Sequence, residues 1–128
     1  MPALEPVEGL RVVATPAAID AARWRGGDVD VLRIAPDEAF GIGATGVEVD
    51  DPDALVEAEA GFAVALLAED DVASLAAHTE WPIPTDPGAV AQGKIAGVPA
   101  KLLIGDPTIL VTQVAYAHEL RTRLGWLG

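Results

Sequence analysis

Hydrophobic and polar positions alternate along the last third of the chain and then change to a helical spacing. Alternation over short segments separated by turn residues is typical of strands. The expected strands are Gln92–Val98, Ala100–Ile104 and Thr108–Gln113. From Val114 to Trp126 the apolar residues Ala117, Leu120 and Leu124 recur at intervals of three and four. This spacing predicts one amphipathic helix after the three strands.

The earlier part of the chain contains shorter apolar segments bounded by cap and turn residues. Thr15-Pro16 predicts a helix start, because a threonine side chain caps free N–H groups and proline suits the first helical position. A second helix begins with acids in its first turn, as the helix dipole favours. The expected strands are Leu10–Ala14, Val29–Ala35, Ala39–Gly43 and Phe62–Leu67, and the expected helices are Ala17–Trp24 and Glu69–Thr79. Val72, Leu75 and Ala76 are expected to form the buried stripe of the second helix.

Three segments carry no such pattern. Residues 1–9 are expected to be a flexible lead-in, and the acidic stretch Thr45–Glu59 an exposed loop. Trp81–Gly88 contains three prolines and is expected to be an extended connector, because proline prevents helix there. The order of elements then predicts an α+β fold with a mostly antiparallel sheet and about three helices, in one domain spanning residues 1–128.

Composition narrows the classes of partner. The chain of 128 residues carries 20 acidic and 8 basic side chains, a formal net charge of −12. This charge opposes binding to nucleic acid and to anionic membranes, which both need lysine and arginine. The charge either attracts a basic partner or only keeps the surface soluble. No apolar segment reaches the length of a membrane span and no signal peptide is seen, which predicts a cytoplasmic protein.

Two motifs suggest ligands, but their surroundings argue against them. Gly41–Gly46 matches the dinucleotide pattern GxGxxG, yet the residues that follow are acidic and not helical. A strand end and a turn are therefore expected there. Asp50, Asp51 and Asp53 lack the spacing of a calcium loop. We expect neither a cofactor nor a metal ion.

Catalytic side chains are scarce. The chain has no cysteine, Ser74 is its only serine, and its two histidines, His78 and His118, are not spaced as metal ligands. No catalytic residue is therefore expected, although a general acid–base role for His118 is the alternative. The candidates for a ligand site or a protein interface are Arg33, Trp81, Lys94, Lys101, Tyr116 and His118.

These candidates have competing structural explanations. Trp81, Tyr116 and Trp126 either anchor a partner, as aromatic residues do at interfaces, or close the ends of the core. Lys94 and Lys101 either bind an anion or protect an edge strand from aggregation.

Three segments resemble the folate-binding fold of the glycine-cleavage T-protein, and within it the gamma subunit of heterotetrameric sarcosine oxidase. They are Val31–Glu38, Gly97–Leu103 and Tyr116–Leu124. The first contains the Pro-Asp-Glu turn of that family, followed here by Ala39-Phe40 in place of the usual aromatic residue, and residues 45–88 do not align. The resemblance implies a ferredoxin-like T-protein fold.

The resemblance also implies an accessory subunit, because flavins, oxidation and folate binding belong to other subunits of that complex. The first hypothesis is therefore a non-catalytic accessory or interaction domain with a protein partner or self-association. The alternative is a stand-alone protein that binds a small molecule such as a folate or a carboxylate in an apolar pocket with a few polar groups.

Overall fold

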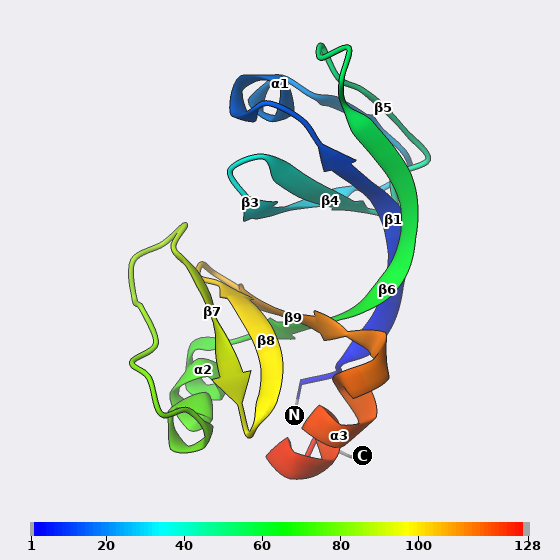
Figure 1. Cartoon of the computed structure of the whole chain (residues 1–128). Coiled ribbons are helices and arrows are strands. Elements are labelled where there is room, and N and C mark those ends of the chain that lie inside the picture. Colours follow the sequence, from blue (N-terminus) through cyan, green and yellow to red (C-terminus); the bar gives the residue numbers. More distant parts are fainter. Residues whose placement is uncertain (1, 127–128) are drawn as a thin grey trace. The chain divides into compact units, whose positions relative to one another are not determined.

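The computed structural model describes residues 2–126 and shows an α+β fold with antiparallel strands (Figure 1). The described chain forms two compact units. Unit 1 contains the residues up to Pro6 and from Gly61 onward, and unit 2 is Val7–Ala60. Two strands, β1 (Glu5–Val13) and β6 (Leu55–Leu67), continue from one unit into the other.

Unit 2 is built on the hairpin of β3 (Asp30–Ala35) and β4 (Glu38–Ile42), with β1 antiparallel to β4. Helix α1 (Pro16–Asp20) and the two-stranded sheet of β2 (Arg23–Arg25) and β5 (Gly46–Glu48) complete this unit. The buried cluster consists of Val12, Ala14, Ala18, Ile19 and Ala39. The predicted cap is confirmed, because the Thr15 side chain accepts a hydrogen bond from the Ala18 N–H at 3.3 Å.

Unit 1 contains a sheet with the strand order β6-β9-β8-β7. Strands β7 (Val90–Ile95), β8 (Val98–Leu103) and β9 (Thr108–Gln113) follow one another as an antiparallel meander. Helix α2 (Glu69–Leu75), the short 3₁₀ helix η1 (Ala76–His78) and helix α3 (Val114–Leu124) belong to the same unit. The buried cluster of unit 1 consists of Leu4, Ala63, Ala65, Leu67, Leu75, Ala91, Ile95, Val98, Ala100, Leu102, Leu110, Ala117 and Leu120.

The predicted helix at the end of the chain is confirmed within the described residues. Ala117 and Leu120 are buried, and Leu124 packs against the same core. The helix ends because Gly125 adopts the left-handed conformation with φ 74°, which glycine tolerates without steric cost. The expected inner position of Ala76 is wrong, since Ala76 is exposed, whereas Leu75 is buried and Val72 packs against the core.

The β7–β8 turn lies earlier than the pattern predicts. Ala96 and Gly97 form it with φ angles of 51° and 80°, so the first strand ends at Ile95 rather than Val98. Positive φ at both central residues matches the twist of a two-residue hairpin. Ala96 therefore holds a conformation that a residue with a side chain rarely adopts.

Three expectations for the weakly patterned segments are wrong. The expected lead-in to residue 9 is a strand from Glu5, and the expected helix Ala17–Trp24 ends at Asp20 and is followed by β2. The expected loop Thr45–Glu59 contains β5 and the start of β6. Residues 5–9, β2, β5 and the first part of β6 contain no fully buried residue, so the alternation that burial produces is missing from their sequence.

Membrane insertion through a helix is not indicated. Across residues 2–126, every helix is too short or too polar to span a bilayer.

Candidate binding site around Trp81

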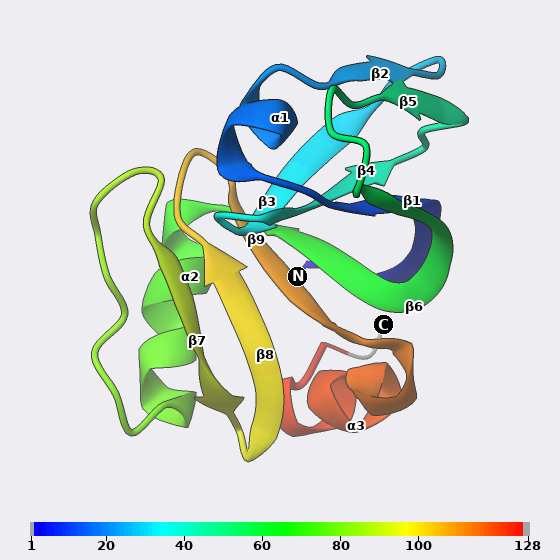
Figure 2. The same cartoon turned by 45° about the horizontal axis from the view of Figure 1, so that its top comes forward.

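Trp81 is fixed at the start of the connector between η1 and β7, which runs beside β7 in both views (Figure 1 and Figure 2). Its indole Nε1 donates a hydrogen bond to the Lys94 carbonyl oxygen at 3.0 Å. The ring packs on Gly93, where an added Cβ would lie 2.6 Å from Nε1. Thr79 Oγ1 donates to the Trp81 carbonyl oxygen at 3.1 Å. The side chain and backbone of Trp81 are therefore both held.

The neighbouring hairpin tip is held by two elements of unit 1. The Ala96 N–H donates to the His78 carbonyl oxygen at 2.7 Å, which ties the tip to η1. The Ala96 carbonyl oxygen accepts from Arg123 Nη1 at 2.6 Å, which ties it to α3, and Arg123 also pairs with Glu119. The β7–β8 turn is therefore a fixed wall beside Trp81.

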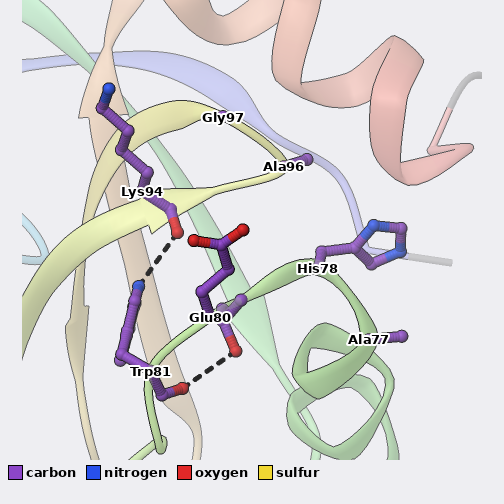
Figure 3. Close-up of a pocket in the computed structure, with 8 residues that line it drawn as sticks. Ala77, His78, Glu80, Trp81, Lys94, Ala96 and Gly97 are labelled. Atoms are coloured by element: carbon purple, nitrogen blue, oxygen red, sulfur yellow. Dashed lines mark hydrogen bonds between the residues drawn. The ribbon is translucent and has the colours of Figure 1, made fainter.

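These groups border an open hollow of about 670 Å³. It is lined by Ala77, His78, Thr79, Glu80, Trp81, Lys94, Ala96 and Gly97. Figure 3 shows the Glu80 carboxylate between the Lys94 side and the His78 side of the hollow, with the Lys94 side chain extending away from the Trp81 ring. His78, Glu80 and Lys94 are exposed, whereas Trp81 is half-buried. The hollow thus combines a held aromatic ring with a charged rim.

The arrangement suits binding better than catalysis. Nucleophilic or acid–base catalysis needs a reacting side chain within hydrogen-bond reach of a base. Among the described residues, neither His78 nor Glu80 makes a side-chain hydrogen bond to another side chain in the hollow. Within residues 2–126 no group of three His, Cys, Asp or Glu side chains could hold a metal ion.

Of the six residues that the sequence suggests, the structure brings Trp81 and Lys94 together. Lys101 lies on β8 opposite Gln92, and Lys94 lies opposite Pro99, so both lysines are on the same face of the sheet. Lys101 is half-buried and does not line the hollow. An anion site made by both lysines is therefore not formed in the hollow.

Arg33 has a structural position in unit 2. Its guanidinium donates to Asp20 Oδ1 and to the Pro36 carbonyl oxygen, each at 2.6 Å, and to the carbonyl oxygens of Ala35 and Pro16 at 3.1 and 3.3 Å. It therefore joins the β3–β4 turn to α1. With its donors directed at these groups, Arg33 is poorly placed to recognise a ligand.

Tyr116 and His118 do not form a joint site. Tyr116 is half-buried and packs against the core of unit 1, which supports a structural role for it. His118 is exposed on α3, and its carbonyl oxygen accepts from Thr122 Oγ1 at 2.9 Å. Residues two apart on a helix face different directions, as the structure confirms here.

Of the residues that line the hollow, only Trp81 and Lys94 were among the sequence candidates, and six were missed: Ala77, His78, Thr79, Glu80, Ala96 and Gly97. Thr79 and Glu80 immediately precede Trp81, so their closeness to it is readable from the sequence. The approach of Ala96 is not, because it depends on the hydrogen bond from Ala96 to His78 across the unit.

The glycine string provides no phosphate site. Gly41 lies in β4, and an added Cβ would be 2.4 Å from the Trp24 ring. Gly46 begins the strand β5, so the helix that a dinucleotide motif requires is not present there. The expected strand end and turn are confirmed, with Gly43 at φ 80°.

Calorimetric titration with NAD, FAD or ATP should accordingly give no saturable heat. The physical reason is that the glycines lead into the strand β5 and not into a helix, and the acidic residues that follow repel a pyrophosphate. Micromolar binding that disappears in Gly43→Val would show that this loop does hold a nucleotide.

Comparison with known proteins assigns no family to this fold and site. No protein-family model matches the chain, and no curated protein sequence matches it significantly.

Proposed function

We propose that this protein is a non-catalytic accessory or interaction domain, and that the hollow around Trp81 is a contact site for a protein partner. The observation that carries this proposal is the way the indole is held. The Nε1–Lys94 hydrogen bond and the Gly93 surface fix the ring before any partner arrives. An aromatic side chain that is already ordered loses little conformational entropy on binding.

The composition of the hollow supports the same proposal. Binding energy at protein interfaces concentrates in tryptophan, tyrosine and arginine, surrounded by a polar rim. Here Trp81 is bordered by the exposed Glu80, Lys94 and His78. Two charges of opposite sign on the rim would orient a partner with a complementary pair.

The resemblance to the gamma subunit of heterotetrameric sarcosine oxidase extends the proposal. A T-protein-like domain of that kind would serve a larger amine-oxidising complex without supplying a reacting group. The α+β class and the antiparallel sheet of unit 1 are compatible with this proposal. The partner would then be a large flavin-dependent subunit encoded beside this chain.

A second candidate function rests on Lys94. A held indole in a hollow suits stacking with an aromatic carboxylate such as a folate, and the Lys94 ammonium would have to turn toward the ring to pair with the carboxylate. The Glu80 carboxylate weakens this alternative, because it projects into the same space and repels an anion (Figure 3).

The test measures binding of a purified large flavin-dependent subunit of a heterotetrameric sarcosine oxidase to this chain and its variants by biolayer interferometry. Trp81→Ala should weaken binding by about 30-fold or more, the effect of losing a hot-spot residue. Lys94→Glu should weaken binding without unfolding the protein, because the bond to Trp81 uses the Lys94 backbone oxygen. The matched control is Gln92→Glu, an exposed residue on the same face of β7 that does not line the hollow.

Equal affinities for the parent, Trp81→Ala and Lys94→Glu would contradict the hollow as a contact site. In parallel, thermal-shift titration with folates should give no saturable shift. A saturable shift that Lys94→Ala removes would favour the small-molecule alternative.

A further inference from the structure

Strand β6 has an open edge in unit 2. Its C-terminal part, Phe62–Leu67, pairs with β9, and β9 ends at Gln113 opposite Phe62, where α3 begins. The N-terminal part of β6, Leu55–Ala58, has β1 as its neighbour in the sheet. Among the strands of residues 2–126, none pairs with the side of Leu55–Ala58 that faces away from β1. We call residues 55–58 the open edge.

The open edge is accessible, and Glu57 is its only charged residue. Leu55 is 58% exposed and Val56 is 47% exposed, and Glu57 and Ala58 are also exposed. Natural edge strands are commonly protected by lysine, proline or a covering segment. Residues 55–58 contain neither lysine nor proline. In a strand, every second residue directs its N–H and C=O groups toward each edge, so the open edge offers backbone groups to an added strand.

Acidic side chains lie on residues 55–58 and on the far side of the neighbouring strand β1. Arg11 on β1 forms a two-bond ion pair with Glu38 at 3.0 and 3.2 Å, and a longer one with Glu57 at 3.6 Å. The hydrogen bonds to Glu38, and then the charges of Glu38, Glu57 and Glu59, raise the pKa of Arg11 above its ordinary value. One guanidinium therefore balances only part of the carboxylate charge. The segment leading into β6 adds Asp50, Asp51 and Asp53.

The negative charge of β6 and its surroundings decides which kind of strand can pair with the open edge. A second copy of this chain would bring its own Glu57 and a net charge of −12 to the same edge. Like charges opposite each other in a strand pair are destabilising, and opposite charges are stabilising. An extended segment with alternating basic and apolar residues would place its basic side chains on the face that carries Glu57 and its apolar ones on the opposite face, which carries Val56.

We propose that the open edge of β6 binds an extended basic segment of a partner protein by strand addition. The proposal rests on the proposed function as an interaction domain, but it uses residues of unit 2, none of which lines the Trp81 hollow. The backbone of Leu55–Ala58 supplies the hydrogen bonds, and the acidic side chains select a segment rich in lysine or arginine.

The experiment uses fluorescein-labelled peptides of alternating lysine and valine, with fluorescence anisotropy as the measurement. The lysine–valine peptide should bind saturably, whereas a glutamate–valine peptide should not. A lysine–valine peptide with every second amide N-methylated keeps its charge but cannot complete a strand pair, and it should lose binding. Hydrogen exchange at the amides of residues 55–58 should slow when the unmodified peptide binds.

The matched variants are Glu57→Lys and Glu48→Lys. Both glutamates have side chains 61% exposed, and each pairs with an arginine, at 3.6 Å for Glu57 and 3.4 Å for Glu48. Glu57→Lys should weaken the lysine–valine peptide by more than about tenfold, because it places like charges in direct opposition. Glu48→Lys makes the same charge change on β5 rather than on residues 55–58, and it should change affinity by no more than about fivefold.

Equal binding of the N-methylated peptide would overturn strand addition in favour of charge attraction alone. Equal effects of the two lysine variants would overturn the location. A concentration-dependent dimer in gel filtration that protects the amides of 55–58 would identify a second copy as the occupant and also overturn the proposal. Trp81→Ala should leave peptide affinity unchanged, so failure at the open edge and failure at the Trp81 hollow are separately observable.

Discussion

Replacing Leu120 with alanine should lower the free energy of unfolding by about 2–5 kcal/mol, the range for a buried leucine that leaves a cavity. The Leu120 side chain is fully buried in α3 and belongs to the core cluster of unit 1. This cluster contains residues of the four-stranded sheet, α2 and α3, together with Leu4 from the segment before β1. A cavity at Leu120 removes van der Waals contacts in the core, and the closely packed neighbours cannot move far enough to restore them. Urea titration followed by tryptophan fluorescence measures the loss, because Trp81 and Trp126 pack against the same cluster.

The control for this substitution is His118→Ala, two residues earlier on the same helix. His118 is exposed, so its removal should change the free energy of unfolding by about 0.5 kcal/mol or less. A Leu120→Ala protein as stable as the parent would contradict the assignment of Leu120 to the core.

The second large effect is expected from Gly9→Ala in β1. An added Cβ at this position would lie 1.9 Å from the Gly41 carbonyl oxygen and 2.8 Å from its carbonyl carbon. Both atoms belong to the backbone of β4, which cannot move aside as a flexible side chain can. Strand β1 must therefore shift away from β4, and the expected cost is about 1–3 kcal/mol, the range for overpacked positions. Trp24 reports the loss by fluorescence, because its ring packs on Gly41.

Gly27→Ala is the matched control. Nothing lies within 4 Å of a Cβ built on Gly27, and its backbone does not require a positive φ. The substitution should leave stability unchanged or slightly raised, since alanine restricts the unfolded chain. Equal stability of Gly9→Ala and Gly27→Ala would show that β1 and β4 do not approach at Gly9 as described.

The local hydrophobic pattern of the sequence was sufficient to predict the strands and helices that bury one face. The strands of unit 1 between Val90 and Gln113 and the helix after them alternate or repeat because one side of each contacts the core. The Thr15 cap was predictable for the same local reason, since its donor is three residues away. The β7–β8 turn was placed too late, because the left-handed conformation of Ala96 is not evident from an alanine.

The open edge of β6 illustrates why the sequence pattern did not predict some of the strands. Residues 55–58 expose apolar and acidic side chains alike, so a strand there has the composition of a loop. It is a strand because β1, more than forty positions away in the sequence, pairs with it. Pairing over such a separation depends on the rest of the unit being folded, and a local window contains no sign of it.

The features of the candidate site are likewise of two kinds, those that the sequence predicts and those that depend on tertiary contacts. The sequence by itself determined the chemical types: a tryptophan beside prolines, few basic residues, no cysteine and a strong negative charge. It also determined the α+β class, because hydrophobic periodicity reflects which side of each element is buried. Only the tertiary structure decided that the Trp81 indole bonds to the Lys94 backbone, that Arg33 donates to carbonyl oxygens, and that residues 55–58 of β6 have an open edge. Those outcomes depend on hydrogen bonds between distant segments, whose partners are chosen by packing rather than by neighbouring residues.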